Sequence, residues 1–170
     1  MMLPQRLTRM RWLGQGPHET YPDRKASGII DVYQGSVASQ HVPYMSPQEN
    51  GGKSDVQWVA LMPDGEGTGV LLKPCRSRDG AGWQANAAYY STAEMEHAVQ
   101  CKDLAPKQPG QAPVHLHLDC RHMGVGGDNS WLPDVTHPEY QISPGQYSYE
   151  MWIRPVNPGE EPEDVANSLG

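Results

Sequence analysis

The chain has 170 residues, which is enough for one domain with its own hydrophobic core. Its 20 acidic and 13 basic residues give a net charge of −7, and this balance argues against a nucleic-acid-binding protein, which needs a basic face. No run approaches 18 apolar residues, so no membrane span is predicted.

The ends and the cysteines indicate a cytoplasmic protein. Residues 1–6 have no apolar segment of the kind found in signal peptides. The cysteines, at positions 75, 101 and 120, are odd in number and contain no C-x-x-C pair, so we expect reduced thiols and no zinc ribbon.

The dominant hydrophobic period along the chain is two, which is typical of strands with one buried face. Short strands are predicted at residues 9–13, 28–33, 56–61, 70–73 and 84–90, with turns at 63–65 and 78–80. Ser91 and Glu94 form the pattern of a capping box, which predicts one short helix near 91–99. Residues 102–113 contain three prolines and are predicted to form a loop.

Two later segments alternate most clearly. In residues 114–120 the apolar side chains occupy every second position, and in residues 147–154 the same alternation predicts that Tyr147, Tyr149, Met151 and Ile153 face inward. The whole pattern predicts an all-β fold, an antiparallel two-sheet β-sandwich, over residues 1–155. Residues 156–170 are acidic and lack aromatic side chains, so we expect a disordered tail.

The segment from His122 to Trp131 is the most informative stretch. Glycines at positions 124, 126 and 127 allow positive φ and a tight turn, and Asp128, Asn129 and Ser130 can cap that turn with side-chain hydrogen bonds. Such a loop presents the indole of Trp131 outward, where its flat face suits the C–H face of a sugar ring. The alternative is a core tryptophan beside an ordinary turn.

Two other groups of polar residues could form a site, but each also has a structural explanation. His115, His117 and Asp119 lie on one strand face and could begin a zinc site, but the solvated face of a half-buried strand fits the alternation better. Glu19 could be an acid, but Arg24 could equally tie carboxylates together in a structural turn. We find no nucleophile paired with a base, and we predict no catalytic residue and no metal ligand in this chain.

Four blocks of the sequence resemble, in the same order, blocks of one enzyme family. They are residues 12–25 (WLGQGPHETYPDRK), 43–51 (PYMSPQENG), 122–131 (HMGVGGDNSW) and 137–140 (HPEY). The resemblance is to the C-terminal domain, or small-chain region, of the bacterial-type β-galactosidases of glycoside hydrolase family two. Asn129 departs from it, since the family usually has a second aspartate there.

The resemblance implies a galactose-mutarotase-like supersandwich, of which this chain would be one part. It implies an enzyme that hydrolyses terminal β-D-galactosyl bonds, as in lactose, with its two catalytic glutamates and its Mg²⁺ and Na⁺ sites in other domains. It also implies that Trp131 forms a wall of the sugar site, with His122, Met123, Asp128, Asn129 and Ser130 supporting the loop. The remaining domains or a large subunit would be partners, and we expect an oligomer. The alternative is a non-catalytic carbohydrate-binding or structural module.

Overall fold

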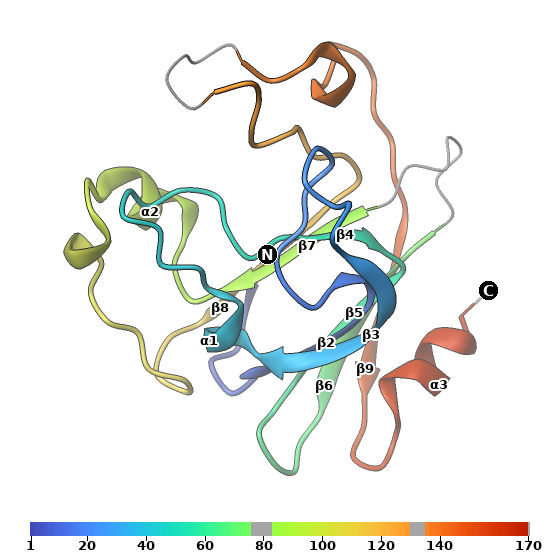
Figure 1. Ribbon diagram of the computed structural model, residues 1–170. Coiled ribbons are helices and arrows are strands. Elements are labelled where there is room, and N and C mark those ends of the chain that lie inside the picture. The colour runs from blue at the N-terminus through green and yellow to red at the C-terminus, as the bar shows by residue number, and fades with distance from the viewer. Residues whose placement is uncertain (76–82, 130–134, 170) are drawn as a thin grey trace.

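The computed structural model describes residues 1–75, 83–129 and 135–169, and its strands form two antiparallel sheets (Figure 1). One sheet has the strand order β3 (Ile29–Ser36), β2 (Arg9–Gly16), β5 (Trp58–Met62), β6 (Gly69–Pro74) and β9 (Met151–Val156). The other has the order β1 (Met2–Leu3), β8 (Val114–Asp119), β7 (Trp83–Ala88) and β4 (Lys53–Val56). The predicted all-β sandwich is confirmed.

The main core lies between the two sheets. Met10 and Trp12 of β2 point into it from the five-stranded sheet, and Val114 and Leu116 of β8 meet them from the four-stranded sheet. The predicted alternation of β8 is confirmed, because Val114 and Leu116 are buried and Leu118, although only partly buried, packs on the same core.

The five-stranded sheet also buries its outer face, which corrects the prediction of a disordered tail. Residues 162–167 form helix α3 (Pro162–Asn167), which lies beside the five-stranded sheet (Figure 1). Its Val165 and Ala166 pack on Trp58 and Leu71. The guanidinium of Arg11 binds the carboxylates of Glu161 at 2.8 Å and Glu163 at 2.9 Å. Acidic composition predicted disorder, but three buried side chains at i, i+3 and i+4 (Pro162, Val165 and Ala166) and one facing arginine order the segment.

The predicted strand at 56–61 is in fact two strands in different sheets. β4 ends at Val56, and β5 begins at Trp58 in the other sheet, so the chain crosses between layers at Gln57. The N–H of Gln57 donates to the carbonyl of Leu13 at 2.8 Å, which secures the crossing.

Helix α2 (Thr92–His97) confirms the predicted helix and its cap. The Ser91 side chain accepts from the Glu94 N–H, and the Glu94 carboxylate accepts from the Ser91 N–H. The predicted turn at 63–65 contains Gly65 at φ 107°, while the turn predicted at 78–80 lies outside the described residues. The remaining short helical turns are α1 (Val37–Gln40), η1 (Cys101–Asp103) and η2 (Pro138–Tyr140).

The last strand differs from its prediction. Tyr147 and Tyr149 precede β9 and are exposed, and Ile153 is 57% exposed although the same face of β9 carries Met151 against the core. β9 is the edge strand of the larger sheet, and Met151 at its start packs against the core while Ile153 stays largely exposed. Alternation indicated the face correctly, but it could not indicate how far along β9 the core extends.

Within the described residues, none of the helices has the length and apolar character needed to cross a bilayer.

Candidate functional site

All four sequence blocks meet at one cavity of about 510 Å³, which we call the motif cavity. The segment after β2, the loop between α1 and β4, the glycine-rich loop after β8 and the η2 turn all contribute to it. Its lining residues are Glu19, Tyr21, Asp23, Arg24, Tyr44, Gln48, Glu49, Val125, Gly126, Gly127, Asp128, His137 and Tyr140.

Glu19 is a structural carboxylate at the base of this cavity. It is 5% exposed and accepts hydrogen bonds from the Arg24 guanidinium, the Tyr44 hydroxyl and, at 2.8 Å, the Gly51 N–H. Burial alone would raise the pKa of Glu19, but these hydrogen bonds outweigh it and hold the pKa below its usual value. A carboxylate that is ionised and fully engaged is a poor proton donor, so the geometry favours the structural interpretation of this block.

Asp23 anchors the glycine-rich loop. Its two carboxylate oxygens accept from consecutive backbone amides, Val125 N–H at 3.1 Å and Gly126 N–H at 2.8 Å. These partners lie 102 and 103 residues away in the sequence. The first and third blocks are therefore joined by two charge-assisted hydrogen bonds.

The glycines of this loop let neighbouring atoms lie close to its backbone. They do not adopt positive φ, which corrects the expectation from the sequence. Gly124, Gly126 and Gly127 all lie outside the left-handed region. A Cβ on Gly124 would lie 2.6 Å from a carboxylate oxygen of Asp23, and a Cβ on Gly127 would lie 2.0 Å from the carbonyl oxygen of Val135. Side chains at these two positions would push the loop away from its supports.

Tyr21 and Glu49 are hydrogen-bonded neighbours in the lining of the cavity. The buried Tyr21 hydroxyl donates to Glu49 Oε1 at 3.2 Å and accepts from the Gly52 N–H at 3.2 Å. Burial, and then the charge of Glu49, raise the pKa of Tyr21 far above its ordinary value, so the phenol remains a donor. The Tyr21 ring also contacts the imidazole of His122, with ring centroids 5.5 Å apart.

The fourth block supports the loop from its other end. His137 Nε2 lies 2.8 Å from Asp128 Oδ1, and this hydrogen bond raises the pKa of the exposed imidazole. The Gly124 N–H donates to the carbonyl of Tyr140 at 2.8 Å. Asp128 thus bonds a side chain of the fourth block, where we had expected it to cap its own turn.

The other predicted site residues divide into two groups. His122 is half-buried, with its Nδ1 2.6 Å from the carbonyl of Met123, while Met123 and Asn129 are exposed. Ser130 and Trp131 lie outside the described residues. The role of Trp131 therefore stays a prediction.

The strand histidines do not form a metal centre in the structure. Within residues 1–75, 83–129 and 135–169, no group of three His, Cys, Asp or Glu side chains could hold a metal ion, and this includes His115, His117 and Asp119. The three cysteines are free thiols.

Sequence reasoning missed the parts played by Tyr44, Glu49 and Asn86. In the second block Glu49 could be an acid, like Glu19, but Asn50-Gly51 predicts first of all a tight turn, and Gly51 does adopt φ 74°. The available signal was the clustering of polar side chains before that turn. Their partners, Glu19 and Tyr21, come from a distant strand end, and no local pattern reveals such pairs.

Comparison with known proteins identifies the family. Residues 1–153, which include all four blocks, match the family model described as "Beta galactosidase small chain". The chain therefore belongs to the β-galactosidase small-chain family.

Relatives named beta-galactosidase occur in several bacteria. The protein of Priestia megaterium (strain DSM 319) is 36% identical over 148 residues, which is 86% of this chain and 13% of the relative. That of Vibrio vulnificus (strain YJ016) is 31% identical over 150 residues, 88% of this chain and 13% of the relative. That of Pseudoalteromonas haloplanktis is 34% identical over 146 residues, 86% of this chain and 12% of the relative. The chain thus spans only about one eighth of the length of these relatives.

Proposed function

We propose that this chain is the small-chain part of a bacterial-type β-galactosidase of glycoside hydrolase family two, and that the whole enzyme hydrolyses terminal β-D-galactosyl bonds such as that of lactose. Family membership supports this proposal. The observation that carries it is the convergence of the four separated blocks on the motif cavity, because a concave space lined by several convergent polar groups is the usual form of a small-molecule site.

In this proposal the chain shapes the sugar site and does not perform the chemistry. Retaining glycoside hydrolysis needs two carboxylates about 5–5.5 Å apart, one as nucleophile and one as acid and base. Glu19 is unsuited to either role because Arg24, Tyr44 and Gly51 already occupy its oxygens. The catalytic glutamates, and the Mg²⁺ and Na⁺ that the enzyme uses, would belong to its other domains.

The glycine-rich loop would deliver the aromatic contact with the substrate. Asp23 fixes the loop at Val125 and Gly126, and the Asp128–His137 pair fixes it again just before Trp131. With both ends of this stretch held, the indole of Trp131 would form an aromatic wall against the galactosyl ring. The partners would be the remaining domains or a large subunit, in a cytoplasmic oligomer.

Reconstitution tests the proposal. The P. megaterium β-galactosidase is truncated to remove the stretch that matches this chain, and the 170-residue chain is purified from a host without its own β-galactosidase. Each part alone should leave o-nitrophenyl β-D-galactoside intact, and the mixture should hydrolyse it. Variants with Gly127→Val should fail to restore activity, because the added side chain collides with the carbonyl of Val135.

Two results would contradict the proposal. Turnover by the chain alone would mean that it contains a catalytic pair. Binding of the two parts without hydrolysis would favour the second candidate, a non-catalytic carbohydrate-binding or structural module.

A further inference from the structure

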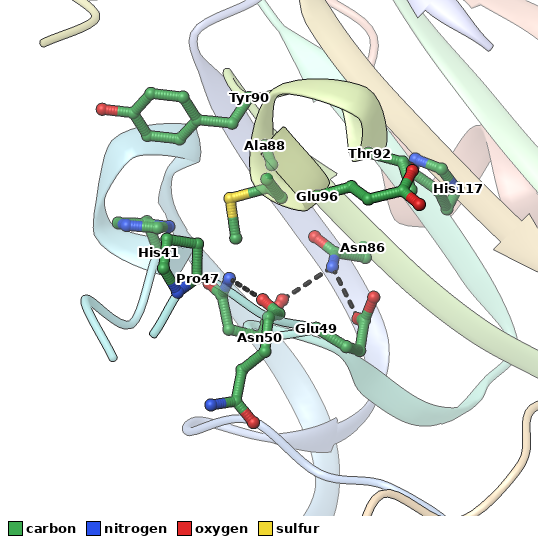
Figure 2. A pocket seen from close by; sticks show the side chains of 12 residues that line it. His41, Pro47, Glu49, Asn50, Asn86, Ala88, Tyr90, Thr92, Glu96 and His117 are labelled. Atoms are coloured by element: carbon green, nitrogen blue, oxygen red, sulfur yellow. Dashed lines mark hydrogen bonds between the residues drawn. The ribbon is translucent and has the colours of Figure 1, made fainter. Parts of the chain in front are cut away.

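A second cavity of about 400 Å³ adjoins the motif cavity, and we call it the adjacent cavity (Figure 2). Gln48 and Glu49 line both cavities, so the two share a wall. The rest of its lining comes from the loop before β4, from β7, from α2 and from β8: His41, Pro47, Asn50, Asn86, Ala88, Tyr90, Thr92, Met95, Glu96 and His117.

The shared wall is held rigidly by hydrogen bonds from both sides. Glu49 Oε1 accepts from the Tyr21 hydroxyl at 3.2 Å and from the Asn86 amide at 2.9 Å. The same Asn86 amide also donates to the carbonyl of Asn50 at 2.6 Å, and Figure 2 shows Asn86 joined to both residues. Because Tyr21 lines the motif cavity and Asn86 lines the adjacent cavity, the Glu49 carboxylate is held between the two cavities and borders both.

The chemistry of the lining selects the class of ligand. Among the described residues, those that line the adjacent cavity include the carboxylates of Glu49 and Glu96 but no lysine or arginine, so the cavity is poorly suited to a phosphate or a carboxylate. In Figure 2, Glu96 lies next to His117 on one side and His41 lies on the other. Burial lowers the pKa of His41, and the neutral imidazole can both donate and accept.

Apolar surface completes the lining. Pro47, Ala88 and Met95 lie among these polar groups, and the Tyr90 ring packs against His41 with centroids 5.2 Å apart. Paired acceptors and donors beside a small apolar surface match the alternating hydroxyl and C–H groups of a sugar ring. A volume of about 400 Å³ falls in the range of small-molecule sites.

We propose that the adjacent cavity is a second saccharide subsite, which holds a neutral sugar unit beyond the one at the motif cavity. The choice of ligand rests on the proposed function, because continuity with a galactoside site is what makes a further sugar unit the expected neighbour. Glu49 would contact both units, while Glu96, His117 and His41 would bind hydroxyl groups of the second unit alone.

Lactose binding to the 170-residue chain tests the subsite without requiring hydrolysis. The imidazole C–H signals of His41 and His117 are followed by NMR and assigned with the single variants His41→Gln and His117→Gln. Lactose should shift both signals saturably, with half-saturation at millimolar concentration, on the order of 1–10 mM.

A matched pair of variants localises the binding. Thr92→Trp fills the adjacent cavity from an exposed position of α2, while Ala93→Trp puts the same bulk on the next residue, which does not line the cavity. Thr92→Trp should weaken lactose binding at least about tenfold, and Ala93→Trp should change it less than about twofold. Circular dichroism confirms that both variants fold.

Three results would overturn the subsite: no saturable shift in the folded wild-type chain, equal binding in the two tryptophan variants, or shifts with tetramethylammonium but none with lactose. The last would identify a cation pocket. The experiment also separates the two proposals. Restored hydrolysis without lactose shifts would refute the subsite alone. Lactose shifts without restored hydrolysis would refute the galactosidase assignment and leave a sugar-binding module.

Discussion

Replacing Asp23 with alanine should release the glycine-rich loop. The carboxylate accepts two loop amides, at 3.1 Å from Val125 and 2.8 Å from Gly126. A hydrogen bond to a charged group contributes about 1.5–3 kcal/mol when well buried, and Asp23 is only partly buried, so we assign about 1 kcal/mol to each bond. Their loss should therefore weaken loop docking by about 2 kcal/mol, or roughly 30-fold in the docking equilibrium.

Amide hydrogen exchange measures this effect directly. The Val125 and Gly126 amides of the Asp23→Ala chain should exchange about 30-fold faster than in the wild type, with the β8 amides little changed. Asp64→Ala is the matched control, because that side chain is 80% exposed and pairs only loosely with Arg9, at 3.8 Å. In the reconstituted enzyme, kcat/KM should fall by a similar factor if catalysis needs the docked loop. Unchanged exchange at both amides would refute the anchoring role of Asp23.

Three further predictions concern activity and stability. Trp131→Ala in the reconstituted enzyme should lower kcat/KM by about 30-fold, mainly through KM, since partly burying an indole contributes about 2 kcal/mol; a loss of about 3–5 kcal/mol in folding stability with normal KM would indicate a core tryptophan instead. Lys53 is buried with its Nζ 5.1 Å from the Trp12 ring centroid, and burial lowers its pKa to about 8. The unfolded lysine, with a pKa of about 10.5, binds the proton more tightly than the folded one. The stability of the wild type relative to Lys53→Met should therefore rise by up to about 3 kcal/mol as pH rises from 8 towards 10.5. Urea denaturation that gives the same stability difference between the two proteins at pH 7 and pH 10 would contradict this. Val165→Ala should cost about 1–2 kcal/mol in thermal or urea unfolding because α3 covers the outer face of the sheet, whereas Asn167→Ala, at an exposed position of the same helix, should cost less than about 0.5 kcal/mol.

Local pattern predicted the elements whose burial is local. β8 alternates because one face meets the core and the other meets water, and the cap of α2 is complete within four residues. β5 gives no such signal, because Val59 and Leu61 face the inter-sheet core while Trp58 and Ala60 face α3. A strand buried on both faces shows no alternation, so its boundary with β4 could not be predicted.

Distant partners explain the other differences. The acidic composition of residues 156–170 predicted disorder. Arg11, which lies 150 residues earlier in the chain than Glu161, binds the carboxylates of Glu161 and Glu163. The resemblance assigned the four blocks to one family, but only the structure reveals that they meet at one cavity and that Asp23 links the first block to the glycine-rich loop. A single sequence contains no local trace of such long-range pairs.

The long spans of these contacts also constrain how the protein is made. The amino group of Met1 donates to the carbonyl of Leu116, and the Asp23 carboxylate accepts from amides more than 100 residues further along the chain. Closing such large loops is entropically costly, so folding should be slow for a chain of this length. On the ribosome, the first strand and the first block would emerge long before their partners exist. A chain that is cut short before residue 125 would therefore lack both amides that Asp23 binds, and the motif cavity could form only after residues 137–140 have been made.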